Sequence, residues 1–369
     1  MFMDRRYMQM ALDLARRGLG RTSPNPAVGA VLVKDGRVVG RGYHARAGTP
    51  HAEIHALREA GAQARGSALY VTLEPCCHHG RTGPCTEAVI EAGVTRVVAA
   101  MTDPNPLVAG RGLERLRRAG IEVVAGVCEA EARRLNEVFI KYITTGLPFV
   151  VLKAAMSLDG RIATRTGHAQ WITGPAARAA GHVLRDRYDA ILAGVNTVLA
   201  DDPSLTTRLA DGRGRDPVRV ILDSRARTPP GARVIKQQSS APTLVAVTPD
   251  APAERVAALK SAGAEVLMLP GDGGRVDLRT LLTELARREL TGVLVEGGGE
   301  VHASFLSAGL ADKVVWFIAP LIIGGRQAPG PVGGDGPATL DGAVGLEQMT
   351  LTRYGEDYCL EGYVRRGEG

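Results

Sequence analysis

Short apolar strand patterns alternate with helical patterns along almost the whole chain, and this alternation constrains the fold more than any other feature. In the first 146 residues the strand patterns "ALYVTL", "TRVVAAM" and "IEVVAG" are separated by helical segments such as "CTEAVIEAG". This order is typical of α/β domains. The segment "VGAVLVKDGRVVGRGY" places Asp35-Gly36 between two strand patterns, which predicts a hairpin and therefore a mixed sheet. We expect "EARRLNEVFIKYI" to form one helix at the end of this region.

The length of the chain and one Gly/Pro segment predict two domains. A chain of 369 residues is too long for one compact core. The segment "TTGLPFV", residues 144–150, places a Gly and a Pro between a long helical pattern and a new apolar strand. We therefore expect domains at 1–146 and 147–369. The second domain also alternates, with strand patterns that include "FVVLKAAMSLDG", "DAILAG", "VRVILD", "GVLVEGGG" and "KVVWFIAP".

Composition narrows the class of protein without naming a function. Hydrophobic residues make up 45% and charged residues 23%, as in ordinary globular proteins. No stretch approaches the ~20 apolar residues of a membrane span, and the N-terminus lacks the apolar core of a secretory signal. We expect a cytoplasmic protein. The net charge of +6 fits nucleic acid and small anionic substrates equally well, but 4% aromatic residues offer few platforms for stacking bases.

Three of the five cysteines lie in "LEPCCHHGRTGPC", residues 73–85, and "GTPHAEIHAL" lies upstream. His51, Cys76 and Cys85 would give zinc three ligands and leave the fourth position for water. Glu53, two residues from a ligand, could stand beside that water as general base. The order H-x-E, P-C and then a second Cys is the signature of zinc nucleobase deaminases. Here eight residues separate the two cysteines, where the general signature has two.

A second cluster of interest is "GVLVEGGGEVHASFL", residues 292–306, where an apolar strand runs through glycines into a helix. The backbone can approach a phosphate closely at such a point, with the helix dipole behind it. The pattern is not G-x-G-x-x-G, so a Rossmann fold is not supported. Lys153 lies inside an apolar strand and needs a carboxylate partner, for which Asp201 and Glu296 are the candidates.

Longer motifs carry a resemblance to a known family. They are "PNPAVG" (24–29), "AGTPHAE" (47–53), "TLEPC" (72–76), "DPNPLVAGRG" (103–112), "LKAAMSLDGRIA" (152–163), "QWITG" (170–174), "AGVNTVLADDPSLTTR" (193–208) and "VILDSRAR" (220–227). With them the chain resembles, over nearly its whole length, the bifunctional riboflavin-biosynthesis deaminase/reductases, which share the longer cysteine loop. The resemblance implies an N-terminal cytidine-deaminase-like α/β/α domain with a mixed sheet. It also implies a C-terminal dihydrofolate-reductase-like α/β domain.

The resemblance implies two reactions. The first is zinc-dependent hydrolytic deamination of 2,5-diamino-6-(5-phosphoribosylamino)pyrimidin-4-one. The second is reduction by NADPH of 5-amino-6-(5-phosphoribosylamino)uracil to the ribitylamino product. Cys77 falls where the family often has Ser, so we expect a bystander thiol. The candidate substrate contacts in the deaminase half are Asn25, His44, His78 and Arg81.

In the reductase half the resemblance implies a larger set of contacts. The implied cofactor contacts are Ala155, Trp171, Thr197, Asp201, Ser224, Gly298, Gly299, Glu300, Val301, His302, Ala303 and Ser304. The implied substrate contacts are Ala169, Arg185, Leu205, Arg208 and Glu296. Arg185 and Arg208 suit phosphate, since a guanidinium fork matches phosphate oxygens. Lys153, with Asp201 or Glu296, could supply the proton that accompanies hydride transfer.

Two other readings stay open on the sequence alone. One is a zinc deaminase acting on tRNA or single-stranded DNA, with an accessory domain. The other is a structural zinc module beside a domain that binds a nucleotide without chemistry. The interpretation as an enzyme with two reactions predicts phosphorylated pyrimidine substrates, one zinc ion per chain and NADPH as cofactor. It also predicts a homo-oligomer that binds neither nucleic acid nor membrane.

Overall fold

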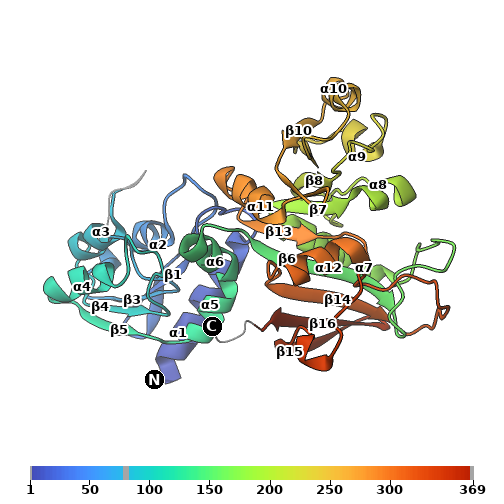
Figure 1. Cartoon of the computed structure of the whole chain (residues 1–369). Helices are drawn as coiled ribbons and strands as arrows, with labels where there is room; N and C mark the ends of the chain where they lie inside the picture. The colour runs from blue at the N-terminus through green and yellow to red at the C-terminus, as the bar shows by residue number, and fades with distance from the viewer. Residues whose placement is uncertain (1, 78–82, 366–369) are drawn as a thin grey trace. The chain divides into compact units, whose positions relative to one another are not determined.

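The chain forms two compact units, Met1–Leu147 and Pro148–Gly369. The structure is a computed structural model that describes residues 2–77 and 83–365 (Figure 1). The last helix of the first unit ends at Gly146, whose φ of +70° is the left-handed conformation that commonly terminates a helix. Pro148 follows and cannot continue a helix. This division lies one residue after the boundary expected from the sequence.

The first unit is built on a mixed five-stranded sheet with the order β2-β1-β3-β4-β5. β1 is antiparallel to β2 and β3, and β3, β4 and β5 are parallel to one another. Asp35 and Gly36 have φ values of +48° and +74°, as a two-residue hairpin turn requires, so the predicted hairpin is confirmed. The strands are β1 (Gly29–Lys34), β2 (Arg37–Tyr43), β3 (Ala68–Val71), β4 (Arg96–Ala99) and β5 (Glu122–Ala125).

Helices pack closely on this sheet where strand glycines admit them. A Cβ on Gly29 would lie 1.9 Å from the Ala11 carbonyl of α1, and one on Gly42 would lie 2.1 Å from the Ala52 carbonyl of α2. These two glycines therefore set the depth at which the helices pack. The helices are α1 (Phe2–Ala15), α2 (Ala52–Ala60), α3 (Cys85–Glu91), α4 (Arg111–Arg118), α5 (Glu129–Leu135) and α6 (Glu137–Thr145).

The prediction of a single helix over "EARRLNEVFIKYI" is wrong, because the helix is interrupted at Asn136, between α5 and α6. The buried side chain of Asn136 accepts a hydrogen bond from Ala27 N at 2.8 Å and donates one to Ala27 O at 3.1 Å. This side chain satisfies both backbone groups of a residue distant in sequence. The tertiary contact overrides the local helical pattern.

The second unit is built on a nine-stranded sheet with the order β10-β9-β8-β7-β13-β6-β14-β16-β15. The strands from β10 to β14 are parallel, and β16 and β15 are antiparallel additions at one edge. β7, β9 and β13 are buried throughout, as expected for central parallel strands covered on both faces. The strands are β6 (Phe149–Ser157), β7 (Ala190–Gly194), β8 (Val218–Leu222), β9 (Thr243–Val247), β10 (Glu265–Met268), β13 (Gly292–Val295), β14 (Lys313–Ala319), β15 (Leu346–Tyr354) and β16 (Asp357–Val364).

The helices of the second unit connect these strands, and a short ribbon, β11 (Gly271–Asp272) with β12 (Arg275–Val276), extends from it. The ribbon was not expected from the sequence. Among the residues described, no helix combines the length and apolar character that a membrane crossing requires. The helices are α7 (Pro175–Arg187), α8 (Val195–Asp201), α9 (Arg233–Lys236), α10 (Ala253–Ser261), α11 (Leu278–Arg287) and α12 (Gly299–Ser307).

Candidate active sites

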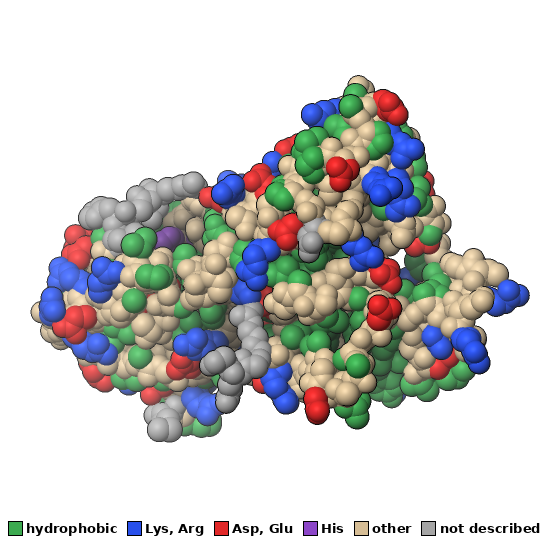
Figure 2. Space-filling model, viewed as in Figure 1, with side chains coloured by type: hydrophobic (Ala, Val, Ile, Leu, Met, Phe, Trp, Pro, Cys, Tyr) green, Lys and Arg blue, Asp and Glu red, His purple; other side chains and the backbone are tan. Residues whose placement is uncertain are grey.

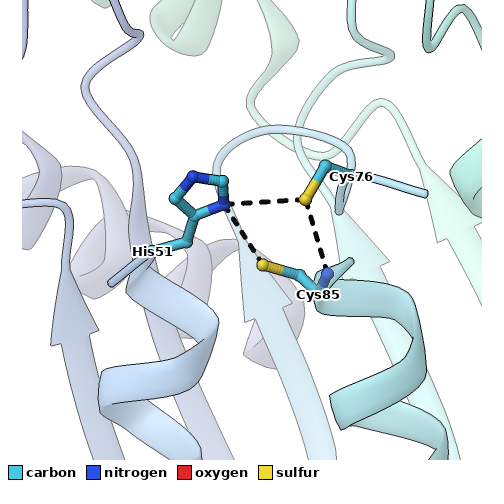
Figure 3. Close-up of side chains that lie close together, drawn as sticks. All are labelled: His51, Cys76 and Cys85. Carbon is cyan, nitrogen blue, oxygen red and sulfur yellow. Dashed lines mark hydrogen bonds between the residues drawn. The ribbon is translucent and has the colours of Figure 1, made fainter. Parts of the chain in front are cut away.

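Three side chains that the sequence analysis selected as zinc ligands lie together in the first unit (Figure 3). His51 is the residue before α2, Cys76 follows β3, and Cys85 is the first residue of α3. His51 Nδ1 is 3.2 Å from Cys85 Sγ and 3.6 Å from Cys76 Sγ. A tetrahedral zinc ion separates N and S ligands by about 3.6 Å, given its ordinary bond lengths. The three atoms therefore fit zinc with little movement.

The charges of this triad favour a cation. The side-chain hydrogen bond with Cys85 lowers the pKa of Cys76 to about 4 and, at the same time, raises the pKa of Cys85. The hydrogen bond with Cys76 raises the pKa of His51. The backbone N–H of Cys85 also points at Cys76 Sγ, at 3.4 Å. Since zinc binds deprotonated ligands, it would take the place of the protons shared within the triad.

Glu53 lies in the first turn of α2, beside this triad but outside it. Its side chain is almost fully buried, and burial together with the negative charge of Cys76 raises its pKa. Cys85 hydrogen-bonds with its carboxylate. A buried carboxyl group with a raised pKa next to a metal site has the properties of a general acid–base.

Of the four predicted contacts to the deaminase substrate, two lie in the described residues. Asn25 Nδ2 is 3.3 Å from His44 Nε2, and the His44 ring packs edge-on against His51 with 5.3 Å between ring centres. Burial lowers the pKa of His44, which favours a neutral ring. Asn25 and His44 thus adjoin the zinc triad. His78 and Arg81 lie outside the described residues.

Glu74 is a functional candidate that sequence reasoning missed. Its buried carboxylate accepts four backbone N–H groups, those of Asp103 (3.0 Å), Gly110 (2.9 Å), Gly112 (2.8 Å) and Leu113 (3.2 Å). These hydrogen bonds attach the segment 103–113 to Glu74, which lies two residues before the ligand Cys76. The signal was present in the sequence, since an acid in the run "TLEPC" between an apolar strand and a ligand needs a buried partner.

The second unit contains a cleft of about 1140 Å³ at the carboxyl ends of β7, β8 and β13. Ligands of open α/β sheets bind outside the carboxyl ends of the strands. Gly298 and Gly299 line the cleft at the start of α12, where the exposed N–H groups and the helix dipole attract anions. A Cβ on Gly299 would lie 2.8 Å from the Gly330 carbonyl, so glycine is needed there. The volume and this glycine turn fit a dinucleotide.

The cleft brings together most, but not all, of the residues implied by the family resemblance. Trp171 is 66% exposed and stacks on Arg178, and neither it nor Ala155 nor Ala303 lines the cleft. His302 is buried and hydrogen-bonds to the carbonyls of Pro331 and Val295, so its side chain serves the fold. The residues from that set that do line it are Ala169, Thr197, Asp201, Ser224, Gly298, Gly299, Glu300, Val301 and Ser304.

Leu205, one of the implied substrate contacts, has a buried side chain. Its side chain is 3% exposed and packs in a hydrophobic cluster with residues such as Ile191 and Val234. A substrate could meet its backbone alone. Its φ of +51° is the left-handed conformation that a branched residue seldom adopts. The neighbouring Thr206 and Arg208 are more accessible.

The sequence left two candidate partners for Lys153, Asp201 and Glu296. The structure pairs Lys153 with Glu296. Lys153 Nζ lies 3.4 Å from Glu296 Oε2. Arg185 adds a bidentate contact to the same carboxylate, with Nε and Nη2 at 2.8 and 2.9 Å. Although burial opposes ionisation, the charges of Arg185 and Lys153 hold the pKa of Glu296 below its usual range. Asp201 lies on α8 at the cleft, where desolvation raises its pKa.

The two predicted phosphate clamps differ in their surroundings. Arg185 is occupied, since its third nitrogen donates to the Thr206 carbonyl at 3.0 Å. Arg208 is exposed, and its backbone N–H donates to His182 Nδ1 at 3.3 Å. Burial, and then the charges of Arg185 and Arg208, lower the pKa of His182 to about 4. A neutral His182 can therefore accept this hydrogen bond. The Arg208 guanidinium donates from Nη1 to Thr206 Oγ1 at 3.1 Å, but it forms no ion pair there and can still receive an anion.

Comparison with known proteins agrees with this pair of sites. Residues 1–101 match the cytidine and deoxycytidylate deaminase zinc-binding region, and residues 148–360 match the RibD C-terminal domain. The riboflavin biosynthesis protein RibD of Aquifex aeolicus is 46% identical over 97% of both chains. That of Escherichia coli is 44% identical over 97% of this chain and 98% of its own. The chain belongs to the RibD family.

Solved RibD structures extend the match to the fold. RibD of Acinetobacter baumannii is 39% identical, covers 99% of both chains and superposes with a TM-score of 0.88. A deaminase/reductase from Thermotoga maritima is 38% identical over 99% of both chains, with a TM-score of 0.85. The chain is therefore a bifunctional deaminase and reductase of riboflavin biosynthesis. It has a zinc-binding deaminase domain and a reductase domain of the NADPH-dependent type.

Proposed function

We propose that the chain deaminates 2,5-diamino-6-(5-phosphoribosylamino)pyrimidin-4-one in its first unit and reduces 5-amino-6-(5-phosphoribosylamino)uracil in its second. The Thermotoga maritima protein is described as a diaminohydroxyphosphoribosylaminopyrimidine deaminase and a 5-amino-6-(5-phosphoribosylamino)uracil reductase. The observation that carries the proposal is the presence of a zinc-fitting triad beside Glu53 in one unit and of a dinucleotide-sized cleft in the other. We assign the deaminase to residues 1–146 and the reductase to residues 147–369.

In the deaminase site His51, Cys76 and Cys85 would hold zinc, and Glu53 would move the protons. When bound, zinc lowers the pKa of a water molecule and so makes it a nucleophile at neutral pH. Glu53 would accept a proton from the attacking water as the water oxygen bonds to the carbon that carries the 2-amino group, and would pass that proton to the ring nitrogen. It would then carry the second proton of the water to the amino group, so that the carbon–nitrogen bond breaks and ammonia leaves. Its raised pKa suits a group that must both accept and donate near neutrality. Asn25 and His44 orient the ring, as neutral hydrogen-bonding groups next to His51.

In the reductase site the glycines at the start of α12 would hold the phosphates of NADPH, which supplies a hydride when bound. Thr197, Asp201 and Ser224 line the same cleft. Lys153 provides the proton that must accompany the hydride, and Glu296 fixes the direction of its ammonium group.

Arg208, rather than Arg185, binds the phosphate of the substrate. Arg185 already places Nε and Nη2 on Glu296, so its role is to position that carboxylate and Lys153. Arg208 is exposed, and the hydrogen bond from its backbone to His182 fixes the segment that carries it. A guanidinium with free N–H groups can form the bidentate contacts that phosphate favours.

A homo-oligomer and a reducing compartment complete the proposal. β15 is an edge strand exposed along seven consecutive residues, Glu347–Arg353, and it carries the exposed apolar side chains of Met349 and Leu351. An open edge with apolar side chains invites a second strand, and we propose a second copy of this chain. We also propose a cytoplasmic location, because Cys76 and Cys85 must stay reduced to bind zinc.

A nucleic-acid substrate is the weaker alternative. Figure 2 shows Lys and Arg side chains spread over the visible face and interleaved with Asp and Glu, without one continuous basic surface. Nucleic-acid binding depends on such a surface and is strongly salt-dependent. The test is metal analysis combined with ammonia release from the diaminopyrimidine phosphate, with a cytidine- or adenosine-containing RNA as comparison. Ammonia from the pyrimidine and none from RNA supports the proposal; the reverse result rejects it.

A further inference from the structure

The two cysteines of the triad come from separate segments of the first unit, Cys76 from the loop after β3 and Cys85 from the start of α3. Eight residues lie between them, where the general deaminase signature has two. Cysteines separated by two residues can share one turn of a helix, but a separation of eight does not by itself set the distance between two sulfur atoms. Hydrogen bonds join the segments directly, from Cys85 N to Cys76 Sγ and from Thr86 N to Cys76 O at 3.2 Å. A third element, α4, contacts both segments.

α4 is attached through Glu74 to the segment that precedes the first cysteine. The Glu74 carboxylate accepts the N–H groups of Gly110, Gly112 and Leu113, which lie at the N-cap and in the first turn of α4. Gly110 has no side chain that could cap the helix, so Glu74 supplies the capping acceptor from another part of the chain. A Cβ on Gly112 would lie 2.1 Å from the Pro75 carbonyl, so glycine is needed for α4 to approach this closely.

α4 is attached through Arg115 to α3, the helix that begins with the second cysteine. Arg115 Nε and Nη2 each lie 2.9 Å from a carboxylate oxygen of Glu87, which is two residues after Cys85. Such a bidentate pair restricts how the two helices are oriented. The two side chains are 44% and 42% exposed, so the pair adds little to the stability of the fold.

We propose that α4 is a brace that holds Cys76 and Cys85 at zinc-binding distance, with Glu74 and Arg115 as its positioning residues. This inference rests on the proposed zinc ligands. Each positioning residue acts through a segment that carries one cysteine, so the brace sets the distance between the sulfur atoms before the ion binds. Loss of the groups that support metal ligands typically lowers metal affinity about 10- to 100-fold.

The experiment measures the dissociation constant for zinc, by competition with a chromogenic chelator, in the wild type, Glu74→Gln, Arg115→Gln and the double variant. Glu74→Gln should bind zinc about 10-fold more weakly. Arg115→Gln should bind it about 2- to 5-fold more weakly, because an exposed pair contributes less. The double variant should resemble Glu74→Gln, since a brace that is already free at one end loses little when the other end is released.

Two control variants separate the brace from general effects on charge and stability. Arg118→Gln removes the same charge from α4 as Arg115→Gln does, but Arg118 pairs at 3.0 Å with Glu114 inside the helix. Arg96→Gln breaks a partly buried pair with Asp4 at the start of β4, the end of the sheet opposite to the cysteine loop after β3. It should lower the stability of the first unit, and neither control should change the affinity for zinc.

Cobalt in place of zinc gives a second readout, because thiolate ligands produce an absorption band that depends on their geometry. This band should change in Glu74→Gln and stay as in the wild type in Arg96→Gln. Unchanged zinc affinity in Arg115→Gln, equal losses in the α4 variants and Arg96→Gln, or additive losses in the double variant would overturn the brace. If Glu74→Gln does not fold, Arg115→Gln against Arg118→Gln decides alone. A wild type without zinc would instead refute the proposed ligands, and the brace with them.

Discussion

Replacing Glu296 with Gln removes the carboxylate that Lys153 and Arg185 share. The side chains of these three residues are between 11% and 17% exposed, so water screens their charges poorly. Gln keeps the shape and one oxygen acceptor but leaves two partly buried cations facing each other without a counter-charge. Breaking a buried ion pair from one side costs about 3–5 kcal/mol. We expect a loss of about 3 kcal/mol, because the retained amide oxygen can still accept one hydrogen bond from Arg185.

Tryptophan fluorescence can follow this loss in the second unit selectively, because both tryptophans of the chain, Trp171 and Trp316, lie in that unit. A loss near 3 kcal/mol should lower the melting temperature of the unit by roughly 6–12 °C. Glu265→Gln is the control. Glu265 pairs with Arg288 at 2.7 Å, but its side chain is 48% exposed, so its removal should cost at most about 1 kcal/mol.

The stability difference between wild type and Glu296→Gln depends on pH, because the pKa of Glu296 is lowered in the folded protein. A carboxylate whose pKa is lower in the folded state stabilises the protein above its unfolded pKa, near ~4.3. That stabilisation disappears as the pH falls through the folded-state pKa. The difference in melting temperature between wild type and Glu296→Gln should therefore be constant above about pH 5. It should begin to narrow below about pH 4 and continue to narrow until the pH reaches the folded-state pKa. If Glu296→Gln melts no lower than Glu265→Gln at pH 7, the reasoning about the buried cluster is wrong.

Three further predictions concern metal binding, loop attachment and assembly. Cys77→Ser should keep about one zinc ion per chain and Cys85→Ala should lose it, by elemental analysis; the opposite pattern would reject the assigned ligands. Glu74→Gln should destabilise the first unit by roughly 1–3 kcal/mol in denaturant titrations followed by circular dichroism, since its carboxylate accepts four backbone N–H groups; an unchanged midpoint would contradict this role. Leu351→Glu should reduce the mass measured by light scattering to that of one chain, whereas Leu340→Glu, outside β15, should not; an unchanged mass in Leu351→Glu would rule out this edge as the interface.

Local patterns predicted those features that depend on neighbouring residues. The hairpin followed from Asp35-Gly36, because few residue pairs adopt two positive φ values in succession. The alternation of strands and helices followed from hydrophobic periodicity. The break at Asn136 could not be predicted in this way, because its cause is Ala27, which lies 109 residues away in the chain.

The candidate sites likewise contain residues that local motifs predict and contacts that only the tertiary structure determines. His51, Glu53, Cys76 and Cys85 were selected from short motifs whose residue types are fixed by zinc chemistry. The choice of Glu296 over Asp201 as partner of Lys153 required the register of β13 beside β6, which no local pattern contains. The occupation of Arg185 by the same carboxylate is likewise a tertiary contact. Such contacts depend on which strands become neighbours, and a single sequence does not specify that.

In the proposed function, one chain holds two chemically independent sites. The most direct measurement assays Glu53→Gln twice: for ammonia release from the diaminopyrimidine phosphate, and for NADPH oxidation with the already deaminated ribosylaminouracil phosphate. Glu53 is assigned to proton transfer alone, so the variant should keep its zinc and lose ammonia release by about 10²–10⁴-fold. NADPH oxidation should equal that of the wild type. If a folded Glu53→Gln protein that still contains zinc also fails to oxidise NADPH, the two reactions share one site and the claim is contradicted.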